Sequence, residues 1–149
     1  MRLEEEIAQD SFNSQYHKLA INIIYTYNWL RSYHEKLFKP YGITMQQYNI
    51  LRILRGQYPN TANIKLIRER MLDKMSDCSR IVEKLRIKGL VDRKTCPNDR
   101  RHVDVLITEK GLDLLKPIDP LIISVDKLLS TVTKEEAVEM NTFLDKLRG

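Results

Sequence analysis

Residues 63–108 read NIKLIRERMLD (63–73), KMSDCSRIVEKLRIKG (74–89) and LVDRKTCPNDRRHVDVLIT (90–108). Apolar residues recur at helical spacing in the first two segments, while the third alternates apolar and polar residues as hairpin strands do. Two helices joined by a tight turn are the unit that places a recognition helix in the major groove of DNA. The stretch therefore predicts a helix–turn–helix followed by a basic hairpin, a wing suited to phosphate or minor-groove contact.

Polar residues and a glycine mark where these two helices begin and end. Thr61 or Asn63 is expected to cap the first helix, and Asp73 is expected to cap a recognition helix over residues 74–88. Gly89 fits the position after that helix, where left-handed backbone is needed.

The hairpin is expected to have strands over residues 90–95 and 102–107, joined at residues 96–99 by a turn with proline in its second position. Alternation along the second strand places three apolar side chains on one face: Val103, Val105 and Ile107. His102 and Asp104 lie on the opposite face.

Helical spacing also appears before this unit. A first long helix is expected over residues 10–38, and its apolar residues cover more than one face. Such a helix needs more than one partner, which indicates both packing within the chain and a subunit interface. Thr44 and Gln47 have the spacing of a capping box, which opens a second helix extending to about residue 55.

After the hairpin, the sequence predicts two further helical regions. Thr108 is expected to cap a long helix that extends to about residue 129. Pro117 and Pro120 fall inside it, and because each removes an amide donor, a kink or a break is expected there. Thr133 and Glu136 form a second capping box, which opens the last helix.

The basic charge of the chain is concentrated in the helix–turn–helix and wing. The net charge of the 149 residues is +5, but residues 65–101 contain twelve Lys and Arg against six Asp and Glu. The remainder contains thirteen against fourteen. Lys and Arg placed on phosphates release counterions and steer association, so this concentration favours a nucleic acid partner over a merely solvated face.

Several function classes lack their signatures in this sequence. No phosphate-binding loop, nucleophile–base arrangement or paired metal ligands are present in the sequence. We therefore expect that the protein is not an enzyme and that it binds no metal and no cofactor. The N-terminal MRLEEE is acidic where a secretory signal would be basic, and the uncharged run over residues 19–30 is too short to span a bilayer. These observations predict a soluble, cytoplasmic protein with no membrane partner.

Three motifs in order resemble the MarR family of bacterial transcriptional regulators: ITMQQYNILRIL (43–54), SRIVEKLRIKGLVDR (79–93) and PNDRRHVDVLITEKG (97–111). The resemblance implies a mainly α, winged helix–turn–helix fold with a two-stranded wing. It also implies a DNA-binding domain over residues 41–107, and dimerisation helices over residues 1–40 and 108–149.

The same resemblance implies a function. A homodimer would bind a pseudo-palindromic operator in double-stranded DNA, repress transcription, and be released by a small aromatic or phenolic effector. The branch of the family that senses organic hydroperoxides carries a reactive cysteine in its first helix. Here the first cysteine is Cys78, which argues against that mechanism.

The DNA-reading face is predicted to consist of recognition-helix residues that do not serve the core: Ser76, Asp77, Ser79, Arg80 and Lys84. Arg80 is the best base reader, because a guanidinium can bond bidentately to guanine. Its alternative role is an ion pair with a neighbour such as Glu83. Asp77 repels phosphate, so it either accepts from a cytosine amine or only caps the helix.

In the wing, the resemblance carries the family's Asp-x-Arg motif onto Asp99 and Arg101. The Asp99 carboxylate would orient the Arg101 guanidinium, whose free edge would enter a minor groove. Lys94, Arg100 and Arg93 are interpreted as phosphate contacts or structural partners. The alternative for Arg101 is a surface ion pair that only stabilises the hairpin.

Aromatic residues in the first two helices suggest a place for the effector. The resemblance implies a pocket between these helices and the long helix after the wing. Tyr33, Tyr48 and Arg52 are the candidate effector residues, because Arg52 can neutralise an effector carboxylate. An aromatic stripe at helical spacing also fits a core or a dimer interface.

Two interpretations of the function are therefore consistent with the sequence. The first is a sequence-specific, homodimeric DNA-binding regulator whose half-sites lie about one helical turn apart, roughly 34–36 Å. The alternative is a winged-helix interaction module that binds protein or RNA without operator specificity.

Replacing Arg101 separates a DNA contact from a stabilising ion pair. For Arg101→Ala, we expect about tenfold weaker DNA binding, with a free energy of unfolding that changes by less than about 0.5 kcal/mol. Fluorescence anisotropy and urea denaturation measure the two quantities. A loss of binding no larger than the loss of stability explains would contradict the minor-groove role.

Overall fold

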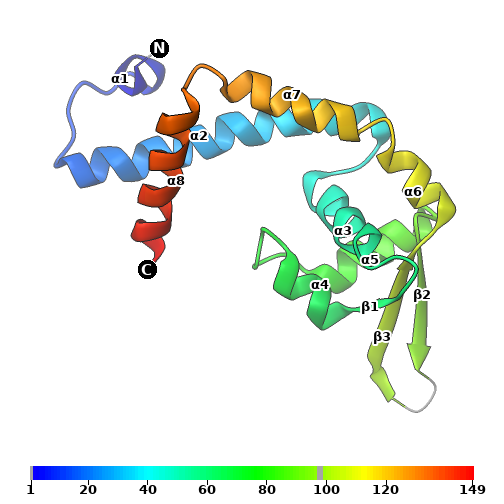
Figure 1. Ribbon diagram of the computed structural model, residues 1–149. Helices are drawn as coiled ribbons and strands as arrows, with labels where there is room; N and C mark the ends of the chain where they lie inside the picture. Colours follow the sequence, from blue (N-terminus) through cyan, green and yellow to red (C-terminus); the bar gives the residue numbers. More distant parts are fainter. Residues whose placement is uncertain (1, 97–98) are drawn as a thin grey trace. The chain divides into compact units, whose positions relative to one another are not determined.

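Helices make up most of the structure, and a small sheet has one strand before the helix–turn–helix and two strands after it (Figure 1). The computed structural model describes residues 2–96 and 99–149, and for residues 95, 96 and 99–102 it describes the backbone only. The chain divides into two units, residues 1–45 and 46–149. The mainly α, winged-helix fold predicted from the sequence is confirmed.

The first unit contains α1 (Leu3–Ile7), the long α2 (Gln15–Phe38) and a short 3-10 turn (Lys39–Tyr41). Helix α2 ends at Phe38 as expected, but it begins later than the predicted residue 10. Ser14 caps it, because the Ser14 hydroxyl accepts from the amide of His17 at 3.1 Å.

The separate helix α1 was not predicted. Its acidic residues attach it to α2, since Glu4 pairs with Lys18 and Glu6 accepts from the Tyr25 hydroxyl. The hydrogen bond from Lys18 is the largest cause that lowers the pKa of the Glu4 carboxyl. Leu3 is the buried residue of α1.

The second unit begins with α3 (Met45–Arg55), α4 (Ile64–Arg70) and α5 (Cys78–Ile87). Each helix buries one apolar face, and the side chains that are almost completely buried include Ile50, Leu51, Leu54, Ile67, Val82 and Leu85. Asn49 of α3 also accepts from the amide of Leu72 at 2.9 Å. This bond ties α3 to the turn between α4 and α5.

The caps of the helix–turn–helix agree with the sequence at two of three positions. Asn63 caps α4 by accepting from the Leu66 amide at 2.8 Å, and Gly89 has a φ of +71° just after α5. The third prediction was wrong, because α5 begins at Cys78 with Asp77 as its cap. Asp73 instead accepts from the amide of Met75 and the hydroxyl of Ser76, which keeps residues 73–76 in a turn.

The wing contains β2 (Val91–Cys96) and β3 (Asp99–Ile107), which pair antiparallel with Val91 opposite Ile107. Both predicted strands are present, but β3 begins at Asp99 and not at residue 102. Val103, Val105 and Ile107, which were expected on one face, are buried. Residues 97 and 98 of the predicted turn lie outside the described residues. A third strand, β1 (Ala62–Asn63), pairs with β3 on the other side. It was not predicted, because two residues carry no readable alternation.

Three helices follow the wing: α6 (Glu109–Leu115), α7 (Asp119–Leu129) and α8 (Lys134–Arg148). The break expected at the prolines is confirmed between α6 and α7. Thr133 and Glu136 form the predicted capping box of α8. None of the described helices combines the length and the apolar character that a membrane span requires.

Thr108 connects the end of the wing to both α5 and α6. Its hydroxyl donates to the Gly89 carbonyl at 2.8 Å and accepts from the Gly111 amide at 3.1 Å. Gly111 makes a very close approach there, since a Cβ on it would lie 2.3 Å from the Leu90 carbonyl oxygen and 2.7 Å from Cγ1 of Ile107. Only glycine fits at this junction.

We expect Gly111→Ala to lower the free energy of unfolding by about 1–3 kcal/mol, the usual cost of overpacking, because the added methyl group meets backbone. Gly56→Ala is the matched control, since its Cβ would find ordinary contacts at 3.5 Å. Urea denaturation followed by circular dichroism measures both. Equal stabilities for the two variants would contradict the close approach at Gly111.

Candidate nucleic-acid interface

Burial of one face of α5 decides which of its side chains point outward. Cys78, Val82 and Leu85 are buried at helical spacing, so the residues between them face away from the core. Ser79, Arg80 and Lys84 are accordingly exposed, as is the capping residue Asp77. The recognition-helix residues predicted from the sequence thus lie on or beside one outward face, with Ser76 half-buried.

Ser76 and Asp77 hold the beginning of α5. Asp77 accepts from the Arg80 amide at 3.1 Å, and the Ser76 hydroxyl donates to Asp73 at 2.7 Å. That hydroxyl is the largest cause that lowers the pKa of the Asp73 carboxyl, followed by the Met75 amide. Asp77 therefore caps the helix, and a contact of Ser76 or Asp77 with bases stays a prediction.

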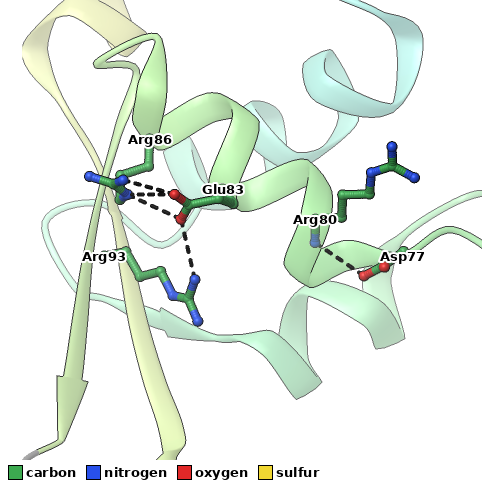
Figure 2. A network of polar contacts seen from close by, with 5 residues as sticks. All are labelled: Asp77, Arg80, Glu83, Arg86 and Arg93. Atoms are coloured by element: carbon green, nitrogen blue, oxygen red, sulfur yellow. Dashed lines mark hydrogen bonds and ion pairs between the residues drawn. The ribbon is translucent and has the colours of Figure 1, made fainter.

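Glu83 pairs with two arginines other than Arg80 (Figure 2). Its carboxylate accepts from Nη2 of Arg86 at 2.8 Å and from Nη1 of Arg93 at 3.3 Å. The Arg80 guanidinium points away from this cluster (Figure 2), and no described side chain pairs with it. The alternative of an Arg80–Glu83 ion pair is therefore wrong for this structure.

The Glu83 cluster connects the recognition helix to the wing, because Arg93 lies on β2. The hydrogen bond from Arg86 is the largest cause that lowers the pKa of the Glu83 carboxyl, and Arg93 adds to it. Arg93 is thus a structural partner, one of the two roles considered for it. This role of Glu83 was not predicted from the sequence, although the three-residue spacing between Glu83 and Arg86 is typical of an ion pair on one helix.

In the wing, Lys94 is exposed on β2, and its Cα lies opposite that of Asp104 on β3. The backbone of Asp99, Arg100 and Arg101 belongs to β3. Their side chains lie outside the described part of the structure, so their predicted DNA contacts stay predictions.

Helix α4 adds basic side chains that were not among the predicted DNA contacts. Lys65, Arg68 and Arg70 are all exposed on this helix. In helix–turn–helix proteins the first helix of the pair crosses the DNA backbone, where cations contact phosphate. The concentration of charge in residues 65–101 was the signal for them.

The candidate effector residues fall into both units. Tyr48 and Arg52 lie together on α3, with the guanidinium carbon 5.9 Å from the centre of the Tyr48 ring. Tyr48 is buried, and this burial raises the pKa of its phenol. Tyr33 belongs to α2 in the other unit, where its ring meets His34 edge-on at 6.1 Å.

Cys78 is a buried core thiol, with its Sγ 3.0 Å from the sulfur of Met71. Within the described residues, no group of three or more His, Cys, Asp or Glu side chains is placed to hold a metal ion.

The sequence and the structure both match known proteins. The model of the MarR family matches residues 43–103. The HTH-type transcriptional regulator MhqR of Bacillus subtilis (strain 168) is 31% identical over 135 residues, which cover 89% of this chain and 90% of that protein.

Solved structures of other proteins have the same fold, and two of them contain a bound ligand or DNA. The organohalide-sensing regulator RdhR-CbdbA1625 in its 2,4-dichlorophenol-bound form matches with a TM-score of 0.81 and 20% identity, covering 94% of this chain and 85% of that one. Sco3205 of Streptomyces coelicolor, a MarR family regulator in complex with DNA, matches with a TM-score of 0.76 and 18% identity, covering 93% and 89%.

Acid should remove the contribution of Glu83 to stability. Since its pKa is lowered in the folded state, this contribution is present above the ordinary pKa of 4.5 and is lost as pH falls through the lowered value. The stability difference between the wild type and Glu83→Gln should therefore shrink as the solution is acidified below pH 4.5. Urea denaturation at a series of pH values measures it.

The control removes both partners of the carboxylate. In an Arg86→Gln, Arg93→Gln background, Glu83→Gln should produce no pH-dependent difference. If the wild type and Glu83→Gln lost equal amounts of unfolding free energy on acidification, the result would contradict the role of the cluster.

Proposed function

Because the chain belongs to the MarR family of transcriptional regulators, we propose that it binds a pseudo-palindromic operator as a homodimer and represses transcription there. Proteins of this family are regulators and not enzymes. The proposed repressor acts on chromosomal DNA in the cytoplasm and is released by a small effector.

The outward face of α5 supports this proposal most directly. Its inner side chains are buried, its first turn is capped, and Arg80 extends from it without a described partner. An unpaired guanidinium at the beginning of a recognition helix is suited to bond guanine in the major groove. The exposed cations Lys84 and Lys94, together with those of α4, would contact the phosphates on either side.

Exposed apolar side chains support a homodimer. On α2 they are Tyr16, Leu19, Ile23, Ile24, Tyr27 and Trp29. On α7 and α8 they include Ile123, Leu129, Val138, Met140, Phe143 and Leu147. Apolar surface of this extent marks an interface, and both helical regions belong to the dimerisation region expected over residues 1–40 and 108–149.

An aromatic or phenolic effector is supported by Arg52, which is exposed beside the buried ring of Tyr48. A phenolate or carboxylate would find a cation there. Tyr33 of α2 is proposed as a further effector residue. The bound 2,4-dichlorophenol in the structure of RdhR-CbdbA1625 shows that this fold takes such a ligand in that protein.

Selection from a pool of random DNA duplexes tests the proposed function. The duplexes that the protein binds are recovered and amplified over several rounds, and the final pool is sequenced. We expect one enriched inverted repeat, with half-sites about one helical turn apart, roughly 34–36 Å. Retention without an enriched motif would contradict the proposal and favour an interaction module without operator specificity.

Two substitutions on the outward face of α5 should behave differently. Arg80→Ala should weaken binding to the selected operator about 5- to 150-fold, the worth of one bidentate base contact. It should weaken binding to random DNA much less. Lys84→Ala should weaken both equally and reduce the salt dependence by about 0.9 in slope. Equal losses on both DNAs for Arg80→Ala would contradict base reading.

A further inference from the structure

Met75 is the most exposed large apolar residue among the described residues, with 94% of its surface accessible to solvent. It lies in the turn between α4 and α5, two residues before the capping residue Asp77. An exposed apolar residue is not unusual by itself. This one stands directly before the helix whose first turn carries Arg80.

The backbone at Met75 is held by hydrogen bonds. Asp73 accepts from the Met75 amide at 3.0 Å and from the Ser76 hydroxyl at 2.7 Å, and the Ser76 amide donates to the Asp73 carbonyl at 3.3 Å. The thioether is therefore projected into solvent from a fixed turn. Its exposure does not come from a loosely connected loop.

The neighbours of Met75 indicate the kind of partner. Lys74 and Arg80 are exposed cations close to it in the chain, and they can meet a polyanion beside the thioether. The carboxylates of Asp73 and Asp77 on either side already accept hydrogen bonds from the turn and from the first turn of α5. The major groove of DNA displays one apolar group, the C5 methyl of thymine. A flexible, polarizable thioether adapts well to such a small apolar partner.

We propose that Met75 contacts a thymine methyl group in the major groove and thereby selects thymine at one position of each half-site. This assignment rests on the proposed function, since it requires the N-terminal end of α5 to enter the groove. Arg80 and Met75 then read two different chemical features, a hydrogen-bonding edge and a methyl group.

Leu72 provides a matched control. It is a second exposed apolar residue in the same turn, with 75% of its surface accessible to solvent. However, it lies next to α4 and five residues before Asp77. If apolar exposure anywhere in the turn were enough, the two residues would be equivalent. Both substitutions remove exposed atoms, so both variants should fold.

The test uses the enriched duplex from the selection, with deoxyuridine replacing each thymine of one half-site in turn. Uracil pairs as thymine does and lacks only the methyl group. For the wild type, one replacement should weaken binding about fourfold, the worth of burying one methyl-sized group. For Met75→Ala, thymine and uracil at that position should bind equally, while Leu72→Ala should retain the fourfold difference.

The outcomes separate this inference from the proposed function. An enriched inverted repeat in which no uracil replacement weakens binding overturns the thymine contact and leaves the regulator intact. A fourfold effect that persists in Met75→Ala, or that disappears in Leu72→Ala as well, also overturns the contact alone. A selection that yields no motif overturns both.

Discussion

Burial of the inner face of α5 is the constraint on which the DNA-binding unit depends. Val82 and Leu85 are completely inaccessible to solvent, and Cys78 lies against Met71. Since side chains on a helix keep a fixed angular spacing, burying these three leaves no freedom in the direction of the others. The outward direction of Ser79, Arg80 and Lys84 is a consequence of core packing.

Polar contacts at both ends of α5 extend this constraint to its neighbours. Asp77 closes the first turn, while at the other end Lys110 donates to the Lys88 carbonyl at 2.8 Å and Thr108 donates to that of Gly89. Glu83 adds a connection to β2 through Arg93. The recognition helix and the base of the wing are therefore held together, so a partner that binds one also meets the other.

The basic residues divide into those that serve the fold and those available to a partner. Arg86 and Arg93 pair with Glu83, and the Lys88 ammonium donates to Gln47. The Arg80 guanidinium, by contrast, has no described partner. A concentration of charge predicts that a polyanion binds, but the contacts within the fold decide which cations remain for it.

Local interactions made much of this structure predictable from the sequence. The caps at Asn63, Thr108 and Thr133, the left-handed glycine at Gly89 and the break between α6 and α7 depend on residues at most a few positions apart, so composition and spacing determine them. Periodicity likewise determined the buried face of β3, where Val103, Val105 and Ile107 alternate with polar residues.

Only the tertiary structure decided the remaining features, because each depends on residues that are distant in the chain or on competition between equivalent groups. Strand β1 exists because β3 lies beside it. Asp73 and Asp77 can both cap a helix, and α5 begins at the second, where Cys78 enters the core. Glu83 had Arg80 three residues away on its own helix, yet packing of the wing brought Arg93 to it. Arg80 has no partner among the described side chains, and it lies at the surface where we propose that it reads DNA.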